Sequence, residues 1–295
     1  MKLNKRPKIN VFMLTYNQEM LVVDSIDSII NQTYTNWELL IGDDCSTDNT
    51  VKIIEKYTDL YPEKIKLIKN NINLGITGNC NNLIKYCDGD YIVFIGGDDL
   101  FFPNKIKSQI EFMLKFPECS MSYHNVEVFD KSKNKVLWLQ NNKKNTFDGD
   151  VSVVIKEGCF FAAQSVMVRN DRRIRYEPTI KIASDWLSFV EYLAQGGKIM
   201  YLNEILGQYV KHGNNTTIIN KDNSNLDHVK SCEYLLENYP QYSKEINYRY
   251  SFTLRTSRKT LPYFQTLVKS LKIRLSFKVI IMLFVFIFTF GKIKI

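Results

Sequence analysis

The sequence lacks the short motifs of several large enzyme classes. It contains no GxxxxGK[ST], no GxGxxG, no GxSxG and no HExxH. These absences exclude the usual kinase, NAD-dependent, serine-hydrolase and zincin interpretations. Six cysteines are present, but none belongs to a CxxC pair or a zinc-type spacing, which indicates reduced thiols in a cytoplasmic protein.

The sequence also shows neither a signal peptide nor an apolar run long enough for a transmembrane helix. The basic N-terminus runs into polar residues without the apolar region of a signal peptide. The apolar run Val279 to Phe290 would span about 18 Å as a helix, whereas the hydrocarbon core of a bilayer is about 30 Å thick. A transmembrane crossing by this run is therefore not expected.

Acidic residues are scarce at the C-terminal end, where eleven Lys and Arg residues from position 244 onward face Glu245 alone. A short apolar segment among basic residues predicts that 272–295 anchor the protein on an anionic membrane surface. The protein is then cytoplasmic and peripheral on the inner face of the cell membrane. A core helix or a protein contact is the alternative. Nucleic acid is not an expected partner, because the basic residues lie beside an apolar tail rather than among exposed aromatics.

What the sequence does contain is a regular alternation of strands and helices in its first hundred residues. This pattern predicts a parallel, Rossmann-like sheet. Strands are expected at Ile9–Leu14, Trp37–Ile41, Ile65–Ile68 and from Tyr91, and helices at 19–31, around Val51 to Tyr57, and at Thr77–Cys87.

The pattern changes after a helix expected from Pro103 to Phe116. Strands are expected at Cys119–Val128, Lys135–Leu139, Phe160–Val168 and Lys198–Leu202, with a helix opening at Asp185 and a loop holding His212. The chain is expected to be helical from about Asn225. The predicted fold class is α/β, with domains at 1–220 (halves 1–103 and 104–220) and a helical extension at 221–295.

Carboxylates lie at the ends of these expected elements. Asp43-Asp44 and Asp98-Asp99 follow strands, and Asp185 opens a helix. Gly96 and Gly97 allow a ligand to approach the backbone closely. A cation held by one carboxylate can neutralise a pyrophosphate leaving group while another carboxylate removes a proton from a hydroxyl. This combination suits nucleotide-sugar chemistry.

At this point the chain resembles a known family. Residues 16–50, NLGITGNCN at 73–81, GDYIVFIGGDD at 89–99 and the block at 184–215 are similar to the signature blocks of family 2 inverting glycosyltransferases of the GT-A type. The resemblance covers roughly residues 8–217. It implies a GT-A fold and an activity like that of bacterial capsule, O-antigen or exopolysaccharide sugar transferases.

The resemblance also implies a role for each candidate residue. Tyr16 stacks on the nucleobase, Asp44 accepts from the ring imide and so favours uracil, and Asp43 supports that turn. The implied sets are Thr15, Tyr16, Asn17, Glu19, Asp43 and Asp44 for the nucleotide, Asp99 and Trp186 for the donor sugar, Asp98 and His212 for Mn²⁺ or Mg²⁺, and Asp185 as the general base.

Two positions depart from the family pattern: Gly96 stands where an aspartate is usual, and Val210 where an arginine is common.

The expected reaction moves a sugar from a UDP-sugar to a hydroxyl of a glycan or lipid-linked acceptor. A catalytically silent nucleotide-sugar-binding or scaffold protein is the alternative. At the level of single residues, Asp44 and Asp185 are also compatible with helix capping, and a homo-oligomer stays open.

Overall fold

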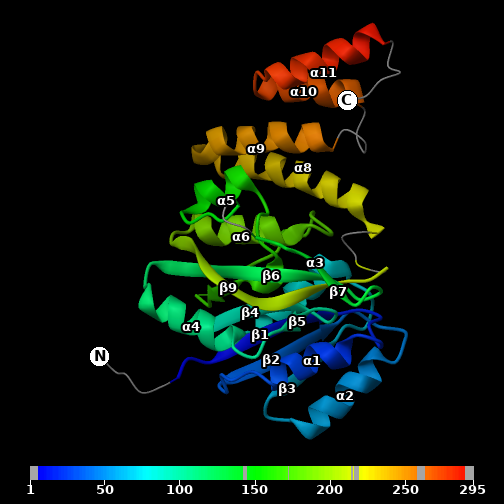
Figure 1. The fold of residues 1–295 in the computed structure, drawn as a ribbon, viewed down its shortest axis with the longest axis vertical. Coiled ribbons are helices and arrows are strands. Elements are labelled where there is room, and N and C mark those ends of the chain that lie inside the picture. The colour runs from blue at the N-terminus through cyan, green and yellow to red at the C-terminus, as the bar shows by residue number, and fades with distance from the viewer. Residues whose placement is uncertain are drawn as a thin grey trace.

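The computed structural model describes residues 6–141, 145–171, 173–213, 215, 219–257 and 263–289. Parts of three predicted segments lie outside these residues: the turn at 142–144, the loop after His212 at 214 and 216–217, and the tail beyond 289. Within the described residues a nine-stranded sheet runs through the lower part of the molecule, and four helices, α8 to α11, are stacked above it (Figure 1).

The first half of the sheet is parallel, as predicted. Its strand order is β3-β2-β1-β4. Helices α1 and α2 pack on one face and α3 on the other, so apolar side chains are buried on both sides of each central strand. The elements are β1 (Ile9–Thr15), α1 (Val22–Ile30), β2 (Trp37–Asp43), α2 (Thr50–Leu60), β3 (Ile65–Lys69), α3 (Gly75–Leu83) and β4 (Tyr91–Gly96).

The second half of the sheet is mixed, also as predicted. It continues from β4 in the order β8-β6-β9-β5, with β7 paired to β6; β6 and β9 are parallel, and the other pairs are antiparallel. The elements are β5 (Leu100–Phe101), α4 (Lys105–Lys115), β6 (Cys119–Asp130), β7 (Lys135–Leu139), α5 (Val151–Glu157), β8 (Met167–Arg169), α6 (Ser184–Ala194) and β9 (Lys198–Lys211).

Several boundaries in this half differ from the predictions. The strand expected at Phe160–Val168 is reduced to β8, because 163–165 form a 3-10 turn and Phe160 and Phe161 pack ring against ring, 4.9 Å apart, in the core. The strand expected at Lys198–Leu202 continues to Lys211, where it ends beside His212. Helix α5 and the short strand β5 were not predicted.

The C-terminal region is helical, as predicted, and consists of α8 (Lys221–Asn238), α9 (Ser243–Thr256), α10 (Tyr263–Ile273) and α11 (Phe277–Phe288). Val229 and Cys232 of α8 and Ile246 of α9 belong to the same hydrophobic core as α5 and α6. The predicted boundary at residue 220 thus falls between β9 and α8, but the two parts share one core. No helix within the described ranges is long and apolar enough to cross a membrane.

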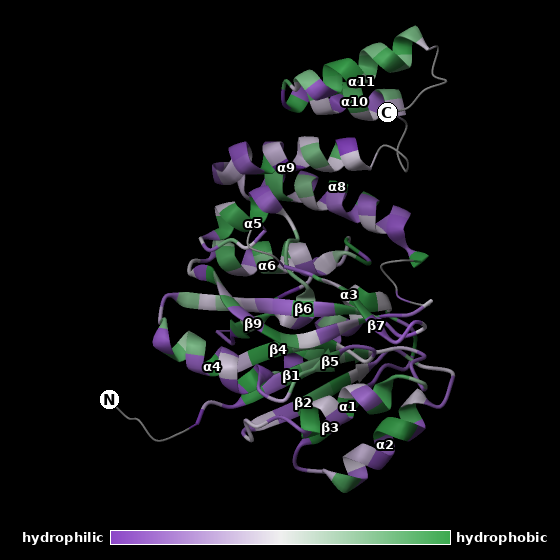
Figure 2. Ribbon diagram, in the orientation of Figure 1, coloured by the Kyte–Doolittle hydropathy of each residue, from purple (hydrophilic) through white to green (hydrophobic). Residues whose placement is uncertain are grey.

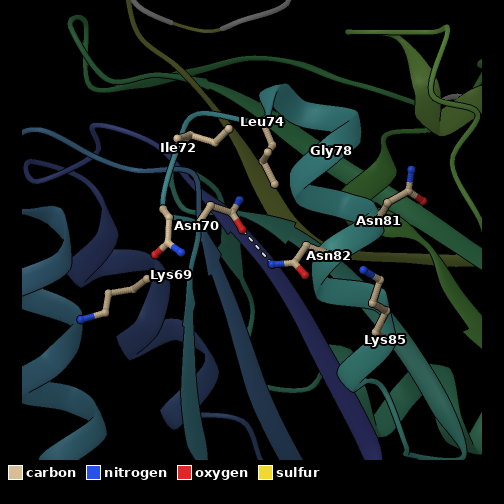
Figure 3. A pocket seen from close by; sticks show the side chains of 9 residues that line it. Lys69, Asn70, Ile72, Leu74, Gly78, Asn81, Asn82 and Lys85 are labelled. Atoms are coloured by element: carbon tan, nitrogen blue, oxygen red, sulfur yellow. Dashed lines mark hydrogen bonds between the residues drawn. The ribbon is translucent and has the colours of Figure 1, made fainter.

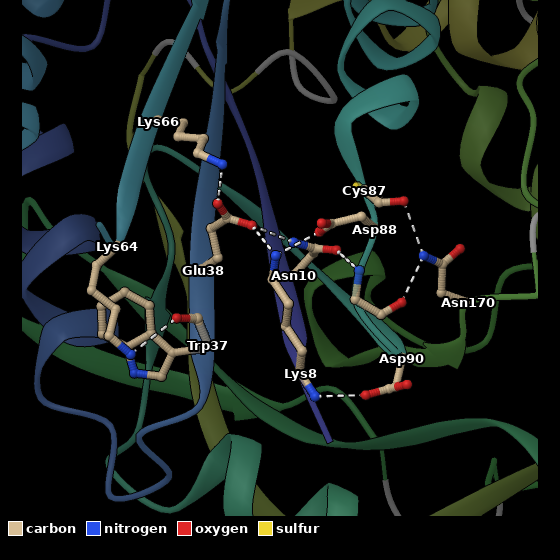
Figure 4. A network of polar contacts seen from close by, with 11 residues as sticks. Lys8, Asn10, Trp37, Glu38, Lys64, Lys66, Cys87, Asp88, Asp90 and Asn170 are labelled. Carbon is tan, nitrogen blue, oxygen red and sulfur yellow. Dashed lines mark hydrogen bonds and ion pairs between the residues drawn. The ribbon is translucent and has the colours of Figure 1, made fainter. Parts of the chain in front are cut away.

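A polar network closes the edge of the sheet where the parallel strands begin (Figure 4). Glu38 of β2 is buried and forms ion pairs with Lys8 (2.7 Å) and Lys66. Asn10 of β1 donates to Glu38 (3.2 Å) and accepts from the backbone N–H of Gly89 (2.5 Å). Because these charged groups pair with one another, we assign this edge of the sheet a structural role. The predicted site residues lie at the opposite edge, where the parallel strands end.

Candidate active site

The carboxyl ends of β1 and β2 form a tightly bonded turn. Asp43 is fully buried, and its carboxylate accepts hydrogen bonds from Thr15 Oγ1 (3.0 Å), Ser46 N (2.9 Å) and Ser46 Oγ (2.6 Å). The backbone carbonyl of Thr15 accepts from Asp44 N at 3.0 Å. Asp43 and Thr15 therefore hold the turn that presents Asp44.

Asp44 combines a fixed oxygen with an available one. Its Oδ1 accepts from Asn70 Nδ2 (2.9 Å) and from Leu74 N (2.8 Å). No described residue donates to Oδ2. A carboxylate held at one oxygen presents the other in a defined direction, which is the arrangement needed to accept from a ring N–H.

The loop after β1 is held against the start of α2. Asn17 has a positive φ of 51°, its N–H donates to Ser46 Oγ (2.9 Å), and its Oδ1 accepts from Thr47 N (2.8 Å). Glu19 accepts from Asn49 at the start of α2, at 3.0 Å from N and 2.7 Å from Nδ2. Tyr16, which directly precedes Asn17, has 48% of its surface exposed. Asn17 and Glu19 thus shape the loop, while the Tyr16 ring is open to a ligand.

The end of β4 brings a carboxylate to an imidazole that is far away in sequence. Asp98 Oδ2 lies 2.9 Å from His212 Nε2, just beyond the end of β9, and 3.4 Å from Asn215 Nδ2. A Cβ atom at Gly96 would lie only 2.5 Å from Asp98 Oδ1. An aspartate at position 96 would therefore clash with the Asp98 side chain as it is placed here, whereas the glycine leaves room for it.

Asp99 points away from solvent. Its Oδ1 accepts from the backbone N–H of Val210 at 3.0 Å. Burial and the neighbouring negative charge of Asp98 raise the pKa of the Asp99 carboxyl well above 3.8. Val210, in the position where the family often has arginine, thus anchors Asp99 through its backbone.

One cavity joins the two halves of the sheet. It has a volume of about 470 Å³, and Gly96 and Asp99 from the end of β4, Asp185 from α6, and Gln164 and Tyr209 all line it. Asp185 lies in the first turn of α6, and its Oδ1 accepts from Trp186 N at 2.8 Å. The acids predicted as sugar and base residues, Asp99 and Asp185, therefore line one cavity. Asp98, the predicted metal residue, does not line it, but its Oδ1 lies beside Gly96, which does.

Trp186, predicted to contact the donor sugar, is elsewhere. The residue is 1% exposed, its Nε1 donates to the carbonyl of Val154 (3.0 Å), and it does not line the cavity. Trp186 lies on the side of α6 that packs into the core, whereas Asp185, one position earlier, lines the cavity. We therefore assign Trp186 a packing role and leave it out of the proposed donor contacts.

Two residues of α8 contact the start of α6, near Asp185, and were not predicted from the sequence. Asp227 is buried, and its Oδ2 accepts from the backbone N–H groups of Lys181 (3.1 Å), Ile182 (2.7 Å) and Ala183 (3.2 Å), the loop that leads into α6. His228 packs against Trp186 with ring centroids 5.9 Å apart. Burial lowers the pKa of His228, while the charge of Asp185 opposes this shift. No local motif marks either residue, because both act across the fold.

Gln164 was also missed, although it is the one polar residue in the run FFAAQ. It is buried in the cavity wall, and neither atom of its amide has a hydrogen-bond partner in the described part of the chain. Leaving a buried amide unpaired costs about 1–3 kcal/mol. Such a group beside a cavity is suited to bonding a hydroxyl of a bound ligand.

A second cleft, of about 510 Å³, lies between the end of β3 and α3 (Figure 3). Its lining is made of asparagines, Lys69, Lys85 and a few aliphatic groups, and it contains none of the predicted site residues. Asn70 connects it to the Asp44 turn, since Asn70 accepts from Asn82 Nδ2 (2.7 Å) and donates to Asp44. This cleft therefore lies next to the Asp44 turn, whereas Asp99 and Asp185 line the other cavity.

A parallel half-sheet joined to a mixed half, with acids where they meet, agrees with the fold that the sequence resemblance implies, that of a glycosyltransferase of the GT-A class. The comparison with known families agrees: the chain belongs to glycosyl transferase family 2, whose model matches residues 10–171. The predicted family and enzyme class are thereby confirmed.

Among curated proteins, the chain is similar to the "Putative glycosyltransferase EpsE" of Bacillus subtilis (strain 168), with 39% identity over 44% of this chain and 46% of that protein. It is also similar to "UDP-Glc:alpha-D-GlcNAc-diphosphoundecaprenol beta-1,3-glucosyltransferase WfgD" of Escherichia coli, with 38% identity over 42% of this chain and 47% of that one. The chain spans about half the length of these relatives.

Among solved structures, S. aureus TarS 1-349 in complex with UDP-GlcNAc superposes with a TM-score of 0.70 at 16% identity, over 92% of this chain and 82% of that one. At this identity the likeness demonstrates the shared fold, and it extends into the C-terminal helices.

Proposed function

We propose that the protein transfers a sugar from a UDP-sugar to a hydroxyl group of a glycan or lipid-linked acceptor in bacterial surface polysaccharide synthesis, with inversion at the anomeric carbon. The observation that carries this proposal is the single cavity lined by Asp99 and Asp185, with the Asp98–His212 pair beside it. Two comparisons support a UDP-sugar as donor. The name of WfgD gives a UDP-linked donor and a diphosphate-lipid acceptor, and TarS has been solved in complex with UDP-GlcNAc.

In this mechanism Asp185 is the general base. Its carboxylate removes the proton of the acceptor hydroxyl, the hydroxyl oxygen bonds to the anomeric carbon, and the bond from that carbon to the diphosphate oxygen breaks on the opposite face. The hydrogen bond from Trp186 N fixes one oxygen of Asp185, and Asp227 fixes the loop before it. Holding both substrates in line supplies much of the rate.

At the nucleotide end, the free Oδ2 of Asp44 accepts from the imide N–H of uracil, and Tyr16 stacks on the ring. Uracil and thymine carry this N–H between two carbonyl groups, whereas guanine carries its ring N–H between one carbonyl and an amino group. Gln164 bonds a hydroxyl of the donor sugar, and Asp99, anchored by Val210 N, orients that sugar.

The donor set beside the cavity fits a divalent cation. A carboxylate and an imidazole 2.9 Å apart can ligate one ion, the carboxylate suits Mg²⁺ and Mn²⁺, and the imidazole favours Mn²⁺. No group of three His, Cys, Asp or Glu side chains forms among the described residues, so an ion at this place would be held by Asp98 and His212 and would need further oxygens, which the donor diphosphate would supply. When bound, the cation neutralises charge on the leaving diphosphate.

The test is a thermal-shift panel of UDP-, GDP- and TDP-sugars with and without Mn²⁺, because a ligand that binds only the folded state raises its unfolding temperature. We expect the UDP-sugars to stabilise the protein most, and more strongly with Mn²⁺. Release of UDP from the best donor then separates an enzyme from a silent binder. Equal responses to all nucleotides, or no UDP release with any acceptor or with water, would contradict the proposal.

The metal assignment has its own test. Asp98→Ala removes one of the two protein ligands, so calorimetry should show UDP binding that no longer responds to Mn²⁺. Asp59→Ala, an exposed aspartate on α2, is the control. A Mn²⁺ response that persists in Asp98→Ala removes this residue from the metal site.

A further inference from the structure

Helices α10 and α11 form a hairpin with its own small hydrophobic core. Val279 and Met282 of α11 are buried against Tyr263 and Leu267 of α10. Tyr263 also meets Phe286, with ring centroids 5.1 Å apart. The hydroxyl oxygens of Ser270 in α10 and Ser251 in α9 lie 2.8 Å apart, and this hydrogen bond attaches the hairpin to the rest of the protein. One face of α11 is therefore packed against α10.

The opposite face of α11 is apolar and open. Phe277, Ile281, Phe284 and Phe288 follow one another at intervals of four, three and four positions, so they form a single stripe along the helix. Phe277 is 78% exposed and Phe288 is 73% exposed, and Leu275 just before the helix is 81% exposed. Figure 2 shows α11 as an almost continuous hydrophobic helix at the end of the molecule farthest from α2. An exposed apolar surface of this kind marks an interaction site.

Cations lie at the N-terminal end of this stripe. The exposed cations are Lys272 in the last turn of α10, Arg274 between the helices and Lys278 at the start of α11. Arg274 also lines a cavity of about 330 Å³ together with Lys156, Lys244 and Tyr248. Glu245 is the carboxylate that lines this cavity, and Glu157 pairs with Lys156 at 3.0 Å. The charge beside the stripe is nevertheless positive.

We propose that the stripe of Phe277, Ile281, Phe284 and Phe288 lies in the interface of an anionic lipid bilayer, with α11 parallel to the membrane plane. Lys272, Arg274 and Lys278 then contact the phosphates of the headgroups. A basic amphipathic element of this type binds through its buried apolar area and through attraction to anionic lipid. The twelve residues of α11 are about 18 Å long, too short to span the bilayer core of about 30 Å.

The surrounding charge favours a membrane over a second copy of the chain. A two-fold contact with the two α11 helices parallel would place the cations of one copy near those of the other, which repel across an apolar contact. In either orientation residues 263–289, which contain no Asp or Glu, offer these cations no anionic partner. An anionic bilayer instead offers apolar depth and negative charge on the same surface. The proposal does not depend on the donor or the acceptor, so its failure would leave the proposed transfer reaction intact.

The experiment is co-sedimentation of the full-length protein with vesicles of phosphatidylcholine alone or mixed with phosphatidylglycerol. We expect binding to the anionic vesicles, weakening as salt rises from about 0.1 M to about 1 M, where the Debye length falls from about 10 Å to about 3 Å. Phe284→Ser/Phe288→Ser should weaken binding about tenfold or more, because two aromatic side chains no longer enter the interface. Lys272→Glu/Lys278→Glu should weaken it in phosphatidylglycerol vesicles only.

The matched controls lie on α2, at the other end of the molecule. Leu60→Ser removes an exposed apolar side chain, and Lys52→Glu/Lys56→Glu makes the same change of charge. These controls should bind vesicles as the unaltered protein does, and all variants should keep its thermal unfolding temperature, since the altered side chains are exposed. Binding that ignores lipid charge, α11 variants that bind normally, or a dimer that Phe284→Ser/Phe288→Ser dissociates would each overturn the proposal.

Discussion

The replacement of Asp185 by asparagine separates catalysis from structure at one position. Asparagine has the same shape, and its side-chain oxygen can still accept from Trp186 N, which is 2.8 Å from Asp185 Oδ1. The first turn of α6 therefore keeps its hydrogen bond, and we expect the free energy of unfolding to change by less than about 1 kcal/mol. What the amide loses is the ability to take a proton.

The expected loss of activity follows from that change. A positioned general base contributes a factor of about 10² to 10⁴ in rate, equivalent to about 2.7 to 5.4 kcal/mol of activation free energy. Because no hydrogen bond joins Asp185 to Asp44 or Tyr16 in the described part of the chain, the affinity for UDP should be unchanged. We therefore expect kcat to fall by that factor while the dissociation constant for UDP stays the same.

Asp150 provides a matched control. It opens α5, and its Oδ1 accepts from Ser152 N at 2.9 Å, but it does not line the cavity. Asp150→Asn makes the same chemical change at the start of another helix, so it should leave turnover intact. The assay is release of UDP with donor and acceptor, with calorimetry for UDP binding. Full turnover in Asp185→Asn, or an equal loss in Asp150→Asn, would show that Asp185 only caps its helix.

Three further predictions address the nucleotide, the loop before the base, and stability. Asp44→Asn turns a donor toward the uracil imide, so UDP binding measured by calorimetry should weaken by about 1–3 kcal/mol, whereas unaltered binding would exclude Asp44 from the base pocket. Asp227→Ala frees three backbone N–H groups before α6 and should lower kcat with little change in UDP affinity, with Asp227→Asn restoring part of it; loss of UDP affinity instead would indicate general unfolding. Burial raises the pKa of Glu38, but hydrogen bonds from Lys66 and Lys8 outweigh this and lower the pKa below 4.5. The stabilisation is thus present above pH 4.5 and lost as pH falls through the lowered pKa, so Glu38→Gln should cost about 1–3 kcal/mol near neutral pH in denaturant unfolding and progressively less in acid; a pH-independent difference would refute the charge argument.

The parallel half of the sheet and its carboxylate ends were accessible from the sequence. Runs such as Tyr91–Ile95 are apolar without interruption because both faces of the strand are covered, and polar residues appear where the strand leaves the sheet. This local physics also placed Asp44, Asp98 and Asp185 at element ends. The family resemblance added the roles, and the match of the family model to residues 10–171 confirms the membership.

The second half was harder, because its pairings join distant segments. The antiparallel contacts of β8 with β4 and β6 are limited to a few residues, and such short strands leave little pattern in the chain. Nothing local distinguishes Phe160 and Phe161, packed in the core, from residues of a strand. The strand boundaries in this half depend on tertiary packing, which local propensity does not predict.

Strand ends, the acids beside them and the basic, apolar C-terminal segment were determined by the amino-acid sequence, since each depends on the chemistry of neighbouring residues. The pairing of Asp98 with His212, the support of the α6 loop by Asp227, the burial of Trp186 and the side of α11 left exposed were settled by tertiary contacts. These contacts join residues tens to more than a hundred positions apart, and their geometry depends on how whole elements pack. For this reason a list of candidate acids becomes a site only in the folded chain.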